Sequence, residues 1–309
     1  MLAKITFSCT VVRVRRLLAL LASLAVLAAC SGSATPQDAS PVVKTTPKRV
    51  LILGNSIARL VGISVEAALA QYGVETKNEA AIELAAWGEK SPLVDHKTNY
   101  AKLVKEFDPD VVLVTTVFVY PLIDCPSTLD DVVACQVAAL KAADVFLAND
   151  LIDTLSAGGA KVVWMRYPTQ GPFYEARADI AVGGVRILEK ELVRIAEKDD
   201  RFAVINYDGV LHNEGEDFSL WFKLQDGFHQ VRAFDGLHIC PYGAELAAAY
   251  IAKSIYPGWT DSDPSWRTGD WREDPLFYLR TYKGTPQCVD GPQPVATPSP
   301  LDVPKGANP

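Results

Sequence analysis

Short apolar segments alternate with longer amphipathic ones along the chain from residue 48 to residue 256. The short segments are rich in Val, Ile and Leu, a composition that favours β-strands. The run after Asp110 is apolar and β-branched as far as residue 119, as in a strand buried on both faces. The expected strands are residues 48–53, 74–82, 110–119, 161–165 and 202–206. Helical periodicity predicts helices at residues 58–72, 99–107, 132–157, 176–198 and 243–255.

Repeated strand-then-helix segments predict an α/β domain, with a mostly parallel five-stranded sheet covered by helices on both faces. Ligands of such sheets bind at the carboxyl ends of the strands. The domain is expected to span residues 48–256. Residues 257–290 form a C-terminal extension with several aromatic residues, which pack on the domain or on one another, or else form a carbohydrate-binding platform. Residues 291–309 are Pro-rich and predicted to be disordered.

The first 30 residues contain four basic residues and no acidic one. An apolar run at residues 17–29 follows the last arginine and falls short of the roughly 20 residues that a membrane-spanning helix needs. This pattern predicts a secretory signal peptide. It ends in Leu27-Ala28-Ala29-Cys30, which resembles a bacterial lipobox, so Cys30 is expected to carry a lipid on the extracytoplasmic side of a cell-envelope membrane. The alternative is an ordinary signal peptide that is cut nearby. Residues 31–47 are predicted to be a flexible tether.

The composition is that of a globular protein and excludes collagen-like and wholly disordered chains. The whole chain has 30 basic and 37 acidic residues, a net charge of −7. Without the four basic residues of the signal peptide, 26 basic and 37 acidic residues remain, a net charge of −11. An acidic chain without a basic cluster argues against binding to nucleic acid.

Four cysteines remain after the signal peptide and Cys30: Cys125, Cys135, Cys240 and Cys288. An even number in an exported chain indicates disulfide bonds, for which three pairings exist. Cys125–Cys135 and Cys240–Cys288 are preferred because each pair lies within one region. Four metal-binding thiolates are the alternative, but the CxxC spacing of zinc sites is absent.

Two segments carry candidate chemistry. Ser56 follows the first strand at the start of a helix, where backbone N–H groups and the helix dipole favour a negative charge. It is either a nucleophile or the N-cap of that helix. Asp235 and His238 precede the last helix with the spacing Asp-x-x-His, which lets the carboxylate orient the imidazole as a general base for Ser56. The alternative is a surface Asp and His that share a loop.

Together, strand–Gly54-Asn55-Ser56–helix and Asp235-Gly236-Leu237-His238 resemble the motifs of the SGNH (GDSL-type) hydrolases. The resemblance covers about residues 48–256. It implies a three-layer α/β/α sandwich of the flavodoxin-like kind, with Ser56 as nucleophile, His238 as general base and Asp235 as its orienting carboxylate. The GxSxG elbow of the α/β-hydrolases is absent.

Three departures from that family concern the turn and the oxyanion hole. Asn55 replaces the Asp of GDS but keeps a polar side chain. Gly88 is the candidate for the glycine N–H of the second motif. The third motif, Gly-x-Asn after the third strand, is missing, and the sequence offers Thr115 and Thr116 there, which are either substitutes or ordinary strand residues. Envelope O-acyltransferases with related domains also tend to lack this asparagine.

These patterns predict an exported, lipid-anchored serine esterase without metal or organic cofactor. Its expected substrates are acyl esters, such as O-acyl groups on envelope glycan or lipid. The alternatives are an O-acyltransferase that modifies envelope polysaccharide and a non-catalytic lipoprotein that binds glycan or a partner protein.

Overall fold

A computed structural model describes residues 41–80, 92–115, 151–171, 192–278, 281–282 and 285–296. The chain divides into two units, Met1–Asp38 and Ala39–Pro309, and every described residue belongs to the second. The predicted signal peptide and the residues Cys30, Gly88, Thr116, Cys125 and Cys135 lie outside the described residues. In the described part of the chain, no helix is both long and apolar enough to cross a bilayer.

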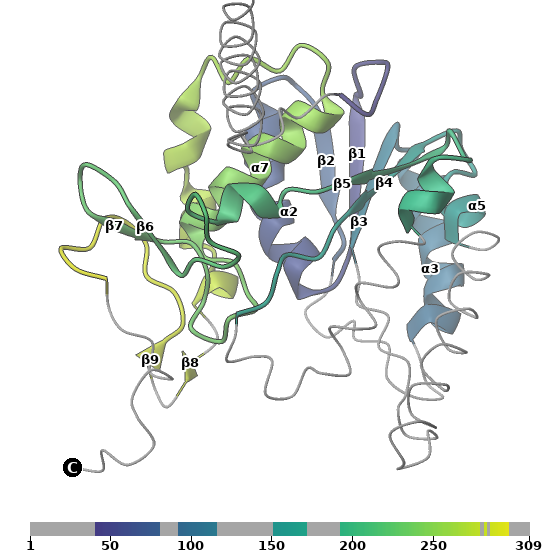
Figure 1. The fold of residues 1–309 in the computed structure, drawn as a ribbon. Helices are drawn as coiled ribbons and strands as arrows, with labels where there is room; N and C mark the ends of the chain where they lie inside the picture. Colours follow the sequence, from purple (N-terminus) through teal and green to yellow (C-terminus); the bar gives the residue numbers. More distant parts are fainter. Residues whose placement is uncertain are drawn as a thin grey trace, which may run out of the picture. The chain divides into compact units, whose positions relative to one another are not determined.

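Five parallel strands form one sheet in the order β2-β1-β3-β4-β5 (Figure 1). The strands are β1 (Arg49–Gly54), β2 (Glu75–Asn78), β3 (Val111–Thr115), β4 (Lys161–Met165) and β5 (Phe202–Ile205). This sheet confirms the predicted α/β fold. The predicted second strand, residues 74–82, is too long, because pairing with β1 ends where Asn78 faces Ile52.

Helices cover both faces of the sheet, which makes the fold a three-layer α/β/α sandwich (Figure 1). On one face, Val50 and Ile52 of β1 pack in a core with α2 (Ser56–Ala70) and α7 (Pro241–Ile255). On the other face, Leu51 and Leu53 pack in a second core with α3 (Pro92–Phe107) and α5 (Ile152–Leu155). Successive strand residues point to opposite faces, so a wholly apolar strand supplies both cores.

The C-terminal extension folds against the core as short 3₁₀ helices rather than as a separate module. They are η5 (Pro264–Thr268), η6 (Asp270–Glu273) and η7 (Pro275–Phe277), followed by a small hairpin of β8 (Thr281–Tyr282) and β9 (Thr285–Pro286). The rings of Trp259, Trp266, Trp271 and Phe277 contact one another in sequence. Trp266 and Phe277 are buried in the core that contains α2 and α7. The predicted packing of these aromatics is therefore confirmed.

Two further elements precede α7: η4 (Asp208–Leu211) and an antiparallel hairpin of β6 (Trp221–Lys223) and β7 (Phe228–Gln230). The hairpin fixes the position of one part of the predicted tail, because the backbone of Gln293 pairs with that of Phe228. At the other end of the domain, Val43 is buried and the N–H of Val42 donates to Ser254 O. Residues 42–43 and 293 thus belong to the folded domain, although the sequence placed them in the tether and the disordered tail.

Candidate active site

Ser56 is the first residue of α2, directly after the turn that leaves β1. The N-cap of the helix is Asn55, whose Oδ1 accepts a hydrogen bond from the N–H of Ile57 at 3.0 Å. Asn and Asp cap helices about equally well, so Asn55 does the structural work expected of the Asp in GDS. The alternative interpretation of Ser56 as the N-cap is wrong, and its hydroxyl is free for another partner.

Gly54 lets β1 and β3 approach closely just before this turn. Its φ is +130°, and a Cβ at this position would lie 1.8 Å from the carbonyl oxygen of Thr115. That same carbonyl accepts a hydrogen bond from the N–H of Asn55 at 3.2 Å. Only glycine tolerates both the positive φ and the lack of space for a Cβ. Thr115, a candidate oxyanion residue, is a fully buried strand residue whose carbonyl supports the turn.

His238 and Asp235 lie in one tight loop that leads into α7. We call residues 231–240 the His238 loop; it is closed by the N–H of Cys240, which donates to Val231 O at 3.0 Å. Asp235 Oδ1 accepts the backbone N–H groups of Leu237 and His238 at 2.8 and 2.9 Å. Its other oxygen, Oδ2, lies 2.6 Å from His238 Nδ1. One carboxylate thus shapes the loop and orients the imidazole.

The structure brings the three predicted residues together across 182 positions of sequence. Ser56 Oγ lies 3.0 Å from His238 Nε2, and His238 itself is only 5% exposed. With Nδ1–H donating to Asp235, Nε2 is left as the acceptor for the serine hydroxyl. Serine, histidine and carboxylate therefore form a continuous chain of hydrogen bonds, the arrangement of a nucleophile, its base and the group that orients the base.

Asp235 is strongly biased toward its ionised form. Burial alone would raise its pKa, but the hydrogen bonds from His238 and Leu237 and the charge of His238 outweigh burial and lower the pKa to about 2. A carboxylate that stays ionised at neutral pH can stabilise the imidazolium that forms when His238 takes a proton.

A second Asp-Gly-x-His segment shows that spacing alone does not make such a site. Asp226 and His229 also pair, with Asp226 Oδ1 3.0 Å from His229 Nε2, but the Asp226 side chain is 60% exposed. The His229 ring contacts the ring of Tyr242 instead of a serine. Within the described ranges, no three His, Cys, Asp or Glu side chains are grouped so that they could hold a metal ion.

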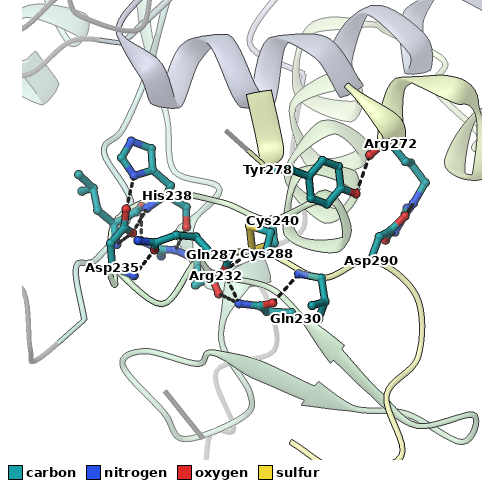
Figure 2. The surroundings of a disulfide bond; sticks show 12 residues. Gln230, Arg232, Asp235, His238, Cys240, Arg272, Tyr278, Gln287, Cys288 and Asp290 are labelled. Atoms are coloured by element: carbon teal, nitrogen blue, oxygen red, sulfur yellow. Dashed lines mark hydrogen bonds and ion pairs between the residues drawn. A yellow bond between two sulfur atoms is a disulfide. The ribbon is translucent and has the colours of Figure 1, made fainter. Parts of the chain in front are cut away.

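Two residues that the sequence analysis missed support the His238 loop (Figure 2). Arg232 is fully buried, and its Nη2 donates to Leu237 O at 2.9 Å and to Gly236 O at 3.4 Å. Gln287 accepts the backbone N–H of Asp235 on its Oε1 at 2.8 Å. The sequence offers no periodic signal for either role, because both depend on contacts across a loop.

The disulfide Cys240–Cys288 ties the C-terminal extension to the His238 loop, with Cα atoms 5.4 Å apart (Figure 2). This bond confirms one of the two preferred pairings. Cys240 follows His238 by two residues, and Cys288 follows Gln287. The disulfide therefore holds Gln287 next to the loop that contains Asp235, whose N–H donates to Gln287. The Cys125–Cys135 pair stays a prediction.

Ser56, Asp235 and His238 all line one cavity of about 120 Å³. Apolar side chains form much of its remaining wall, including Leu60 and Ile239. As the first residue of α2, Ser56 has a backbone N–H without an acceptor inside the helix, which makes it available to an oxyanion. The second predicted donor, Gly88, lies outside the described residues.

No protein-family model matches the chain, and no curated protein matches it. Several solved structures are similar to it. The periplasmic domain of a lipopolysaccharide acetyltransferase from Salmonella ser. Paratyphi A is 13% identical, with a TM-score of 0.43, over 68% of this chain and 84% of that one. A family 3 carbohydrate esterase from Clostridium thermocellum is 15% identical, with a TM-score of 0.40, over 67% and 94%. A GDSL-like lipase from Bacteroides thetaiotaomicron is 15% identical, with a TM-score of 0.39, over 67% and 86%.

The carbohydrate esterase and the GDSL-like lipase are among the solved structures similar to this chain, and the SGNH resemblance of the motifs around Ser56 and His238 stays a prediction from the sequence. At these identities and TM-scores the likeness carries no conclusion about a shared reaction or substrate. The case for chemistry rests on the hydrogen-bonded serine, histidine and carboxylate of this chain.

Proposed function

We propose that the chain is a serine esterase of SGNH type, in which Ser56, His238 and Asp235 act as the catalytic triad. The observation that carries this proposal is the continuous hydrogen bonding from Ser56 Oγ to His238 Nε2, at 3.0 Å, and from His238 Nδ1 to Asp235 Oδ2, at 2.6 Å. A serine hydroxyl is a weak nucleophile unless a base accepts its proton, and His238 is in position to do so.

The first half of the reaction makes an acyl-enzyme. His238 Nε2 takes the Ser56 proton while Ser56 Oγ attacks the ester carbonyl carbon, and the carbonyl oxygen becomes an oxyanion. The backbone N–H of Ser56, at the N-terminus of α2, supports that negative charge. The C–O bond to the alcohol then breaks, and the protonated His238 gives its proton to the leaving oxygen.

The second half restores the enzyme. Water gives a proton to His238 Nε2 and attacks the acyl carbon. The Oγ–acyl bond of the new tetrahedral intermediate then breaks as His238 returns its proton to Ser56 Oγ, which releases the free carboxylic acid. Asp235 remains ionised throughout and stabilises the imidazolium in both halves. These steps require no metal or organic cofactor.

The proposed location and substrate rest on the sequence. The basic, then apolar N-terminal segment and Leu27-Ala28-Ala29-Cys30 support export and lipid attachment at Cys30. An enzyme tethered there would meet acylated glycans and lipids of the cell envelope, and these are the proposed substrates.

Turnover of 4-nitrophenyl acetate and butyrate by the wild-type protein and by Ser56→Ala tests the proposal. Removing the nucleophile should lower kcat on the order of 10⁴-fold or more. Ser64→Ala is a matched control in the same helix, because Ser64 Oγ donates to the carbonyl oxygens of Val61 and Ala244, a structural role. Equal turnover by the wild type and Ser56→Ala would refute the role of Ser56.

Acyl transfer to a sugar hydroxyl is the second candidate function. It is favoured by the end of β3, where Thr115 stands in place of the Gly-x-Asn motif. The same acyl-enzyme would form, but a glycan hydroxyl would attack in place of water. A labelled acyl donor distinguishes the two, since hydrolysis releases labelled free acid whereas transfer places the label on the glycan. A non-catalytic binding protein would give neither product.

A further inference from the structure

The cavity beside Ser56 has a wall made by the C-terminal extension. Leu276, Phe277, Gln287 and Cys288 all line it, together with Leu60 and Ile239 of the domain. The extension therefore contributes directly to the space next to the attacking oxygen.

This wall is fixed to the catalytic loop on one side. The disulfide joins Cys288 to Cys240, and Gln287 Oε1 accepts the N–H of Asp235. Gln287 O also accepts a hydrogen bond from Gln230 Nε2 at 2.8 Å. A bulky acyl group thus cannot push this part of the wall aside without breaking contacts that orient Asp235.

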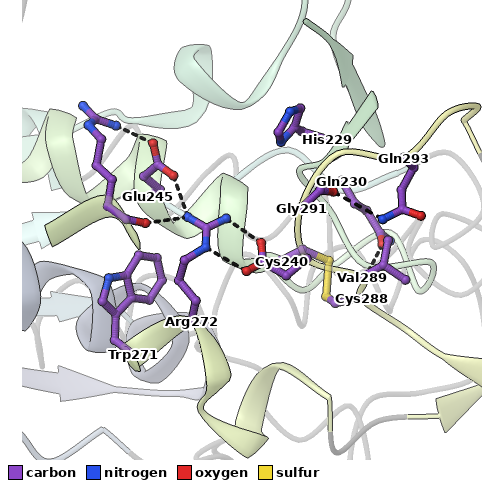
Figure 3. A network of polar contacts seen from close by, with 12 residues as sticks. His229, Gln230, Cys240, Glu245, Trp271, Arg272, Cys288, Val289, Gly291 and Gln293 are labelled. Atoms are coloured by element: carbon purple, nitrogen blue, oxygen red, sulfur yellow. Dashed lines mark hydrogen bonds and ion pairs between the residues drawn. A yellow bond between two sulfur atoms is a disulfide. The ribbon is translucent and has the colours of Figure 1, made fainter. Parts of the chain in front are cut away.

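Largely buried ion pairs fix the same wall to α7. Glu245 of α7 accepts hydrogen bonds from Arg267 Nη1 and Arg272 Nη1, each at 2.6 Å (Figure 3). Arg272 Nε in turn donates to Asp290 at 2.8 Å. Arg267 and Arg272 precede Leu276 and Phe277, and Cys288, joined to Cys240, follows them, so the extension is attached to the domain on both sides of these two residues.

The size and chemistry of the cavity define what fits. An engineered apolar protein cavity of about 150 Å³ holds one benzene molecule. At about 120 Å³, this cavity is smaller than the space that holds one benzene molecule. Arg59 also lines it, but its Nη1 donates to Asn78 O at 2.8 Å. The surface nearest Leu276 and Phe277 is apolar and suits the hydrocarbon part of an acyl group.

We propose that the C-terminal extension forms the acyl-binding wall of the active site, and that Leu276 and Phe277 restrict the substrate to esters with short, uncharged acyl chains of about two to four carbons. This inference rests on the proposed esterase function and adds the substrate class and the residues that set it. Phe277 is 3% exposed and part of the core, whereas Leu276 is half-buried. Leu276 is therefore the better position for a test.

The test compares kcat/KM for the 4-nitrophenyl esters of acetate, butyrate and hexanoate. The wild type should favour acetate and butyrate over hexanoate by tenfold or more, about the discrimination that an apolar pocket achieves for an added methylene. Leu276→Ala should raise the hexanoate-to-acetate ratio by about tenfold, and Leu276→Trp should lower the butyrate-to-acetate ratio by about tenfold. Opposite shifts at one position cannot arise from a general loss of folding.

Trp271→Phe is the matched control within the extension. Trp271 contacts Phe277 and donates from Nε1 to Trp266 O at 2.6 Å, but it does not line the cavity, so its substitution should leave the ratios unchanged. The inference is overturned if both Leu276 variants keep the wild-type ratios, or if the wild type prefers hexanoate. In either case, turnover that depends on Ser56 leaves the proposed function intact. Turnover that does not depend on Ser56 overturns both.

Discussion

Asp235 has two roles in one side chain, because Oδ1 holds the backbone of the His238 loop and Oδ2 holds the imidazole. The ionised form is favoured in the folded state, where the pKa is about 2 against an ordinary value of 3.8. A carboxyl with a lowered folded-state pKa stabilises the fold at pH values above its unfolded pKa. That contribution disappears as the pH falls toward the folded pKa.

Asp235→Asn should therefore change both catalysis and the pH dependence of stability. We expect kcat to fall by about 10⁴-fold, since an amide neither fixes the tautomer of His238 nor stabilises its charge. The wild type should be more stable than the variant near pH 6, and the part of that difference due to ionisation, about 2 kcal/mol, should vanish between pH 4 and pH 2. Urea unfolding at each pH measures it.

Asp226→Asn is the matched control, because Asp226 lies in the other Asp-Gly-x-His segment with an exposed carboxylate. It should leave kcat unchanged. If Asp226→Asn lowers kcat as much as Asp235→Asn does, the assignment of the orienting carboxylate is wrong. A stability difference between the wild type and Asp235→Asn that does not change with pH would contradict the lowered pKa.

Among the elements, the His238 loop and the C-terminal extension depend on each other. The disulfide closes a segment with a sequence separation of 48, which on the chain-entropy model stabilises the fold by about 4 kcal/mol. It also keeps Gln287 in contact with the N–H of Asp235. A loop anchored in this way holds the His238 imidazole at a fixed distance from Ser56.

The double variant Cys240→Ser/Cys288→Ser should lose about 4 kcal/mol of unfolding free energy and about tenfold in kcat, because a small displacement of the base is costly. Denaturant titration and ester kinetics measure the two effects. Dithiothreitol should lower kcat of the wild type in the same way and leave the double variant unaffected. A reduced wild type with full kcat would show that the disulfide does not position the loop.

The contact between α7 and the extension depends on Glu245, whose side chain is 12% exposed and meets Arg267 and Arg272. Glu245→Gln leaves two largely buried guanidinium groups with less compensating charge. The free energy of unfolding should fall by about 2–4 kcal/mol. Glu106→Gln is the control, since Glu106 pairs with Lys102 on an exposed surface and should change stability by less than about 0.5 kcal/mol. Equal effects of the two substitutions would contradict this account.

At the scale of the molecule, the sequence predicted the sheet and the central residues of the site because both depend on local signals. Apolar runs located β1, β3, β4 and β5, whereas β2 consists of polar residues and was predicted with the wrong bounds. The turn at Ser56 and the spacing of Asp235 and His238 located the candidate site. The sequence does not decide whether Ser56 caps α2, and the structure shows Asn55 in that role.

What the sequence could not predict depends on contacts between distant segments. Arg232 and Gln287 act on the His238 loop through backbone groups, which leave no pattern in the sequence. The cavity wall at Leu276 follows from how the extension folds back, although the preferred Cys240–Cys288 pairing already indicated its proximity. Val43, expected in a tether, is buried beside Val42, whose N–H donates to Ser254 O of α7.

The central claim is that Ser56 is a nucleophile activated by His238. Reaction of the full chain with a fluorophosphonate, followed by peptide mass spectrometry, tests it most directly, because the probe bonds to activated serines and needs no knowledge of the substrate. We expect one phosphonate per chain, located on Ser56, absent in Ser56→Ala and strongly reduced in His238→Ala. No adduct, or an adduct on another residue that persists in Ser56→Ala, would contradict the account.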